Sequence, residues 1–249
     1  CSWAEFADYI MKSNKKKTSY GDVIIMADTE TSKKEGLKKH DNHIVAWSIA
    51  IRAFHHNIVC LWGQNPYDFN ECLKRIRGAI ASDELYVFYH NLSYDWIFQR
   101  KFYFEAFGYP TDQLNTRPFN PLYIKFENGI ILKDSLALAQ RSLAKWAKDL
   151  NVEHQKALGK WDYNKYRNQD DILSEDELLY IQNDVLSGVE CLDATCQILK
   201  KTIGSMPYTA TGIVRGEARA IGRAYYAHKW FKKLQPDDYY LQLIFENLL

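Results

Sequence analysis

Short runs of apolar residues, each about the length of a β-strand, recur through the first half of the chain. The run at 23–30 turns acidic at its end, which is typical of a buried central strand that delivers polar groups at its carboxyl end. Further strands are predicted at residues 44–54, 57–63 and 84–91. The polar residues 31–42 are expected to form a loop, and Asn128-Gly129, between two β-rich runs, predicts a tight hairpin.

Segments with helical periodicity follow these strands. In residues 66–82 the apolar positions are spaced 3, 1, 3 and 4 residues apart, as on one face of a helix. Other helices are predicted at residues 95–108, 142–150, 217–234 and 237–249. The longest predicted helix follows Ser174, which stands three residues before Glu177 in a capping-box pattern, and extends to residue 201. Strands that lead into helices from the start indicate a mixed α/β domain.

The composition is that of an ordinary folded protein. The 249 residues are 47% hydrophobic and 25% charged, which suits one large domain or one domain with an appendage. Lysine and arginine number 32 against 31 aspartates and glutamates, so the net charge of +1 gives no overall field for a polyanion, and any nucleic-acid site must be a local patch.

Cysteine usage and hydropathy bear on the environment of the chain. Five cysteines without a C-x-x-C pair favour a reducing, cytoplasmic setting over a zinc or disulfide framework. No apolar stretch approaches about 18 residues, and the basic run near residue 15 follows the apolar residues instead of preceding them. Neither a membrane span nor a secretion signal is expected.

Four carboxylates stand at positions where chemistry is expected. Asp28 and Glu30 share one face of the first strand, Asp95 begins a predicted helix, and Asp184 lies one turn after Tyr180 in the long helix. Like charges held a few ångströms apart resist joint ionisation unless a cation lies between them. Two Mg²⁺ or Mn²⁺ ions would meet that demand and suit phosphodiester hydrolysis. The alternative is that each carboxylate is a separate cap or surface charge, with Asp95 as an N-cap.

Three motifs in order resemble a known family. They are ADTET (27–31), HNLSYD (90–95) and YIQND (180–184). The chain is similar to the DEDD-type 3′→5′ exonucleases of the tyrosine subtype, and more narrowly to the proofreading domain of protein-primed family B DNA polymerases of phages and linear plasmids. That resemblance implies a ribonuclease H-like exonuclease fold, with a mixed central β-sheet flanked by helices.

Two further segments extend the resemblance. KDSLALA (133–139) resembles the Ser-Leu motif with which these polymerases hold single-stranded DNA and the terminal protein, and GKWDYNKYR (159–167) resembles their Lys-x-x-hydrophobic motif. No polymerase signature occurs in the chain, so we expect an amino-terminal fragment of a longer polymerase or, as the alternative, an independent exonuclease. The domains expected are a lead-in at 1–21, the exonuclease at 22–205 and a helical segment at 206–249 that leads toward a polymerase domain.

The resemblance also implies roles for the site residues. Asp28 would bridge both metals, Glu30 would hold the catalytic metal and orient the attacking water, and Asp95 and Asp184 would complete the metal site. Tyr180 shares a helix face with Asp184, so its phenol is placed to hydrogen-bond the nucleophilic water. Lys160, with Lys156 as the weaker candidate, would offset charge at the scissile phosphate, the alternative being a solvated loop lysine.

A grip on single-stranded DNA is expected from six residues: Thr31, Asn91, Tyr94, Phe98, Ser135 and Leu136. For Phe98 and Leu136, packing in the core is an equal alternative. The partners expected are a DNA 3′ end, the polymerase domain of the parent chain and a terminal protein, with a monomeric chain in the host cytoplasm. Two rival hypotheses are a catalytically inactive module that binds DNA or terminal protein, and a stand-alone enzyme of the same superfamily that trims RNA.

Overall fold

The computed structural model describes residues 23–33, 42–53, 58–80, 84–155 and 160–225. The chain forms two compact units, Cys1–Tyr208 and Thr209–Leu249. In the second unit helix α7 spans Ala210–Tyr225. The expected lead-in at 1–21 and the expected helix at 237–249 lie outside the described residues. No helix within the described ranges is both long and apolar enough to cross a membrane.

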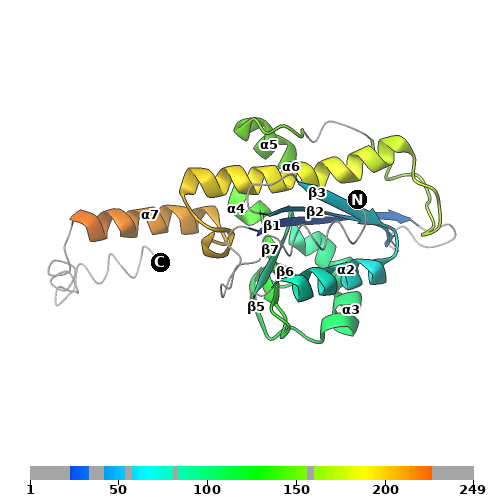
Figure 1. The fold of residues 1–249 in the computed structure, drawn as a ribbon, viewed down its shortest axis with the longest axis horizontal. Coiled ribbons are helices and arrows are strands. Elements are labelled where there is room, and N and C mark those ends of the chain that lie inside the picture. The colour runs from blue at the N-terminus through cyan, green and yellow to red at the C-terminus, as the bar shows by residue number, and fades with distance from the viewer. Residues whose placement is uncertain (1–22, 34–41, 54–57, 81–83, 156–159, 226–249) are drawn as a thin grey trace. The chain divides into compact units, whose positions relative to one another are not determined.

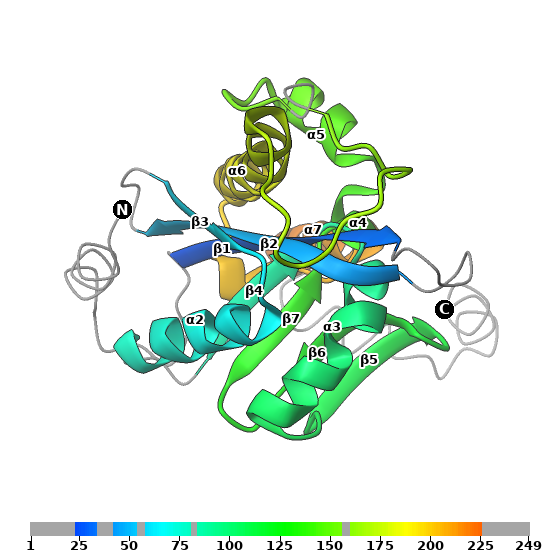
Figure 2. The same cartoon turned by 90° about the vertical axis from the view of Figure 1, so that its right-hand side faces the viewer.

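The first unit is built on one mixed sheet in the order β3-β2-β1-β4-β7-β6-β5 (Figure 2). Its strands are β1 (Val23–Lys33), β2 (Asn42–Ala53), β3 (Val59–Gly63), β4 (Leu85–Tyr89), β5 (Asp112–Arg117), β6 (Asn120–Lys125) and β7 (Ile130–Asp134). β1 runs antiparallel to β2 and parallel to β4, and β4 runs parallel to β7. The long strand β1 therefore lies inside the sheet, between an antiparallel neighbour and a parallel one, and Asp28 and Glu30 lie in its second half.

Helices cover both faces of this sheet. They are α2 (Pro66–Ala79), α3 (Leu92–Phe107), α4 (Leu136–Ala139), α5 (Leu143–Leu150) and α6 (Glu175–Leu199), followed by a 3₁₀ turn at Ile203–Ser205. Figures 1 and 2 show α2 and α3 on one face, with α5 and α6 on the other. The fold class is thus confirmed as α/β, with a mixed central sheet flanked by helices.

Each face has its own apolar packing. Alternate side chains of β1 point to opposite faces, and Ile25 and Ala27 belong to a buried cluster that also contains Phe69 of α2 and Tyr103 of α3. On the other face Met26 lies against Gly188 of α6, where an added Cβ would come within 2.6 Å of the Met26 Cγ. α6 can approach β1 this closely because residue 188 has no side chain.

Most of the predicted elements are present, and two predictions about local structure are corrected. The hairpin at Asn128-Gly129 and the capping box of α6 are confirmed, the latter with Ser174 and Glu177 bonded reciprocally. Residues 31–33 continue strand β1 instead of opening a loop, because they pair with β2 through a register shift after Glu30. Helix α3 begins at Leu92, three residues before the predicted start. Strand β5 was not predicted.

Candidate active site

The acidic residues of β1 lie on the face of the strand that packs against α6. Asp28 and Glu30 lie on the same side of the strand as Met26, the residue that contacts Gly188. On α6, Asp184 precedes Gly188 by one turn and therefore points to the same side of the helix. The close packing at Gly188 thus brings the carboxylate of α6 against the two carboxylates of β1.

Three of the four predicted carboxylates converge. One oxygen from each of Asp28, Glu30 and Asp184 lies within 4.8 Å of the others. Glu30 and Asp184 are only 5% and 3% exposed, so their charges are held out of bulk water. Oxygen donors in this number and spacing fit a hard divalent cation such as Mg²⁺ or Mn²⁺, which prefers carboxylate ligands.

Asp95 approaches the same place from the opposite face of β1. Its Oδ1 accepts hydrogen bonds from the backbone N–H of Thr29, at 3.1 Å, and from the Thr29 hydroxyl, at 2.5 Å. Burial raises the pKa of Asp95 to about 7, although the hydrogen bonds from Thr29 oppose this shift. The alternative that Asp95 caps α3 is wrong, because Asn91, at a φ of 87°, occupies the N-cap position.

These groups surround a cleft of about 120 Å³. The described residues that line it are Asp28, Thr29, Glu30, His90, Asn91, Tyr94, Asp95, Tyr163, Tyr180 and Asp184. All four predicted acids and Tyr180 therefore meet in one cleft, although they come from β1, α3 and α6. Among its described lining residues there is no lysine or arginine.

Two tyrosines stand together at the cleft. The hydroxyl groups of Tyr163 and Tyr180 lie 3.3 Å apart, within hydrogen-bonding distance. Burial and the nearby Asp184 carboxylate both raise the pKa of Tyr180, so this phenol keeps its proton near neutral pH and can donate a hydrogen bond. Sequence reasoning did not assign a role to Tyr163 or His90. His90 belongs to the HNLSYD motif and Tyr163 to the GKWDYNKYR segment. Membership of these motifs was the one sequence signal that could have assigned them to the site.

The residues expected to hold DNA form two groups. Tyr94, 38% exposed, shares a hydrogen bond with the Thr31 hydroxyl, and its ring centroid lies 5.1 Å from that of Phe98. Tyr94 and the half-buried Phe98 thus form an aromatic pair on α3, and the buried Thr31 of β1 holds Tyr94 from beneath. Ser135, by contrast, is fully buried, and its hydroxyl donates to the Tyr89 carbonyl, while Leu136 is half-buried.

The buried carboxylate of Asp134 holds this second group in place. It accepts hydrogen bonds from the backbone N–H groups of Asn91 and Leu92 at the start of α3, and of Leu136 and Ala137 at the start of α4. One side chain therefore fixes the starts of two helices, as N-capping residues do singly. Asn91 and Leu136, which come from different motifs, are held together by this carboxylate.

The predicted lysine is not part of the cleft lining. Lys160 is exposed and lies in the segment between α5 and α6, and Lys156 lies outside the described residues. The neighbouring Trp161 and Arg167 are buried, with the Arg167 guanidinium 4.1 Å from the Trp161 ring centroid. This segment is therefore fixed by residues other than Lys160, whose assignment to the scissile phosphate stays a prediction.

The sheet order and the flanking helices agree with the ribonuclease H-like fold that the resemblance implied. No protein-family model matches the chain, and no curated protein matches it either. Solved structures of phi29 DNA polymerase match it in fold. The complex with single-stranded DNA aligns at a TM-score of 0.63 and 18% identity, over 85% of this chain and 36% of the polymerase.

A second phi29 structure, the post-translocation binary complex with primer-template DNA, aligns at a TM-score of 0.63 and 17% identity. The match covers 86% of this chain and 39% of that one. The chain thus spans little more than a third of the length of the polymerases it resembles. At this level of identity the likeness shows a common fold.

Proposed function

We propose that this chain is a metal-dependent 3′→5′ exonuclease that hydrolyses single-stranded 3′ ends of DNA. It would be the proofreading portion of a protein-primed family B DNA polymerase. The observation that carries the proposal is the convergence of Asp28, Glu30 and Asp184 within 4.8 Å, in a cleft that Asp95 and Tyr180 also line. The similar phi29 DNA polymerase structures are complexes with single-stranded and with primer-template DNA, which supports the choice of substrate.

The carboxylates are suited to hold two Mg²⁺ or Mn²⁺ ions. Asp28, Glu30 and Asp184 would supply most of the ligands, with Asp95 beside them on the other face of β1. When bound, two such ions stabilise the attacking and leaving oxygens of an in-line displacement at phosphorus. Because Thr29 fixes Asp95 through two hydrogen bonds, the fourth carboxylate is oriented before any ligand arrives.

Tyr180 would orient the attacking water. Its phenol lines the cleft one helical turn before Asp184, and its raised pKa keeps the hydroxyl protonated at neutral pH. The hydroxyl could therefore donate to a water or to a phosphate oxygen, whereas Glu30 would hold the catalytic metal and help to orient the water. Lys160 would join only on substrate binding, to offset charge on the scissile phosphate.

The 3′ end would lie over the exposed Tyr94 ring and the half-buried Phe98, with the buried Thr31 hydroxyl holding Tyr94 in place. Aromatic faces stack on any base, which suits an enzyme that must remove every nucleotide. Asn91 and Leu136 would contact the strand from the region held by Asp134, whereas Ser135 is fully buried and would support this region from beneath through its hydrogen bonds to the Tyr89 carbonyl. Neither group includes a residue placed to read base identity.

The proposal includes a division of the chain into domains and a set of partners. Since the aligned polymerases are much longer than this chain, we propose that residues 22–205 form the exonuclease domain and that 206–249 lead toward a polymerase domain. A terminal protein would be a second partner, and the exonuclease itself would work as a monomer.

Release of nucleotides from a 3′-labelled DNA primer tests the proposal. With Mg²⁺ or Mn²⁺ the chain should shorten the strand from its 3′ end, and a chelator should stop the reaction. The Asp28→Ala, Glu30→Ala double variant should be inactive, whereas Glu175→Gln, an exposed change on α6, should not affect the rate. Full activity of the double variant would refute the assignment.

The same assay separates the rival hypotheses. DNA binding without strand shortening, measured by titration calorimetry with the same oligonucleotide, would indicate a binding module. Faster hydrolysis of a matched RNA oligomer than of DNA would indicate an RNA-trimming enzyme, since the two substrates differ at the 2′-hydroxyl.

A further inference from the structure

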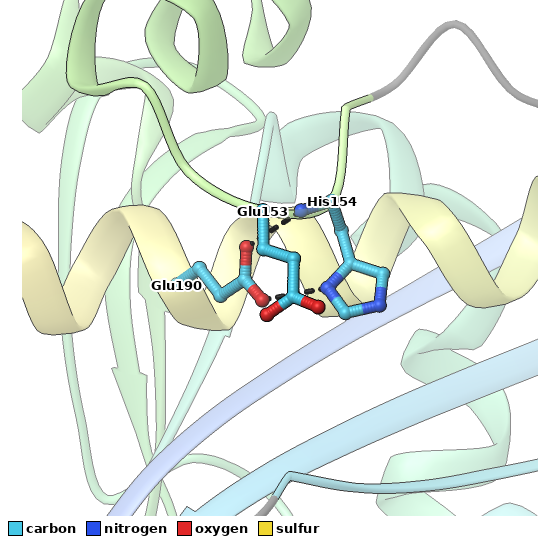
Figure 3. Close-up of side chains that lie close together, drawn as sticks. All are labelled: Glu153, His154 and Glu190. Atoms are coloured by element: carbon cyan, nitrogen blue, oxygen red, sulfur yellow. Dashed lines mark hydrogen bonds and ion pairs between the residues drawn. The ribbon is translucent and has the colours of Figure 1, made fainter.

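A second group of metal-ligating side chains lies between α5 and α6. Glu153 and His154 follow α5, and Glu190 projects from α6 toward them (Figure 3). One donor atom of each residue lies within 4.8 Å of the other two. An imidazole nitrogen and two carboxylates, from a loop and a facing helix, thus converge on one point.

Two contacts hold this group in shape. The Glu190 carboxylate accepts the backbone N–H of His154 at 2.9 Å, and its other oxygen lies 2.6 Å from the His154 Nδ1. The first contact does not involve the imidazole, so it can remain when the ring nitrogen takes another partner. Figure 3 shows the Glu153 carboxylate on the Nδ1 side of the ring.

The charges of the group favour a cation. Two carboxylates lie together, and the imidazole beside them is charged only when it is protonated. Within the described part of the chain, neither Glu153 nor Glu190 forms an ion pair with a lysine or arginine. The Glu190 side chain is also mostly buried, at 11% exposure. Water therefore stabilises its negative charge less than it stabilises that of the exposed Glu153.

We infer that Glu153, His154 and Glu190 form a second cation site that takes a transition metal of the Zn²⁺ type. One imidazole and two carboxylates form a mixed nitrogen and oxygen donor set, which suits Zn²⁺ better than Mg²⁺. His154 would bind through Nδ1 with its remaining proton on Nε2, and water would complete the tetrahedron. An imidazolium would release one proton to solvent on binding.

This site is separate from the proposed catalytic cleft. Glu190 follows Asp184 by six residues on α6, which is a rise of about 9 Å and a different face of the helix. None of its three residues lines that cleft. The metal would therefore tie the segment after α5 to α6 without taking part in hydrolysis, and would stabilise the fold because the site forms only in the native chain.

Zinc binding to a chain with a disabled cleft tests the inference. In tag-free protein carrying Asp28→Asn, Glu30→Gln and Asp184→Asn, titration calorimetry with ZnCl₂ should show one site, and Zn²⁺ should raise the thermal midpoint. Adding Glu153→Gln or His154→Ala should weaken zinc binding at least about tenfold, since each removes a ligand. Adding Glu175→Gln, an exposed change on the same helix, should leave binding unchanged.

A spectroscopic measurement supports the ligand assignment. Co²⁺ in place of Zn²⁺ should give the visible absorption of a four-coordinate site in the cleft-disabled chain, and this absorption should disappear with His154→Ala. Glu153 is exposed, so Glu153→Gln keeps the test valid if His154→Ala does not fold. Absence of zinc binding in the cleft-disabled chain, or equal binding in the Glu153→Gln form, overturns the inference. Neither result depends on nuclease activity.

Discussion

Helix α6 carries buried carboxylates in two different environments. Near its start, Glu177 is surrounded by donors: it accepts from the Arg167 and Lys165 side chains and from the backbone N–H of Ser174. Seven residues further on, Asp184 lies with two other carboxylates, in a cleft whose described lining includes no lysine or arginine. Cationic side chains of the protein thus neutralise Glu177, whereas Asp184 lies beside two other carboxylates.

The difference appears in the pKa values of the two regions. Burial raises the pKa of Glu177, but the hydrogen bonds from Ser174, Arg167 and Lys165 outweigh it and lower the pKa to about 2. At the cleft, burial dominates and raises the pKa of Asp95 to about 7. Glu177 and Asp95 are both almost inaccessible to solvent, yet their pKa values shift in opposite directions, and only the cleft calls for a cation from outside the chain.

The largest effect is expected from Asp184→Asn. Under the proposed function it should lower nuclease activity at least about a thousandfold, or about 4 kcal/mol in the barrier, because a metal ligand is lost. Thermal stability should stay the same or rise, since a like charge is removed. The primer assay and a melting curve measure both, and Asp176→Asn, exposed on the same helix, is the control. A large loss of stability would instead show that Asp184 stabilises the fold, as Glu177 does.

Glu177→Ala should show the opposite pattern. The change leaves the buried Arg167 guanidinium without its carboxylate and removes the capping box, so the free energy of unfolding should fall by about 3 kcal/mol. Nuclease activity of the folded fraction should be nearly normal. Urea unfolding is the measurement, with Glu175→Ala, exposed in the same turn, as the control. A change below about 0.5 kcal/mol would show that the ion pair contributes nothing.

The two regions should also give opposite pH dependences in chelator-treated protein. The pKa of Glu177 falls from 4.5 to about 2 on folding, so its contribution to stability is present above pH 4.5 and is lost toward pH 2. The pKa of Asp95 rises from 3.8 to about 7, so stability should decline as pH rises from about 4 to about 7. Asp95→Asn should remove the decline in stability between about pH 4 and about pH 7. Glu177→Gln should remove the loss of stability toward pH 2. Thermal midpoints that differ from the wild type by a constant amount at every pH would contradict both expectations.

The smallest effect is expected at the DNA-binding surface. Phe98→Ala should raise the KM for a single-stranded primer about tenfold with little change in kcat, because one base loses its stacking partner. Ile97→Ala, an exposed change on the same helix, should leave both constants unaltered. A fall in stability without a change in KM would instead give Phe98 a packing role.

Elements with strong local signals could be predicted from the sequence. The Asn128-Gly129 hairpin and the Ser174–Glu177 capping box depend on residues that are adjacent in the chain, and both are present. The four acids were grouped by motif resemblance, and the structure brings all of them to one cleft. Their spacing in the sequence alone did not separate Asp95, held by Thr29, from the three that lie within 4.8 Å.

What could not be predicted depends on contacts between distant segments. Strand β5 is exposed at every position, and Leu114 is its one apolar residue, so it lacks the alternating pattern of a half-buried strand and exists through its pairing with β6. His90 joins the cleft because it follows β4, which pairs with β1, and Tyr163 joins it through the contact of its hydroxyl with that of Tyr180. The hydrogen bond from the Leu92 N–H to the Asp134 carboxylate likewise joins residues that are 42 positions apart in the chain.

Gly188 shows that the chemistry of the cleft depends on an atom that is missing. A methyl group at this position would lie 2.6 Å from the Met26 Cγ, so with alanine the Met26 side chain, the helix or the strand would have to shift. The separation of the acids on β1 from the acid on α6 is therefore set one turn away, by a residue that could never coordinate anything. A search confined to reactive side chains would overlook the position that determines whether they can act together.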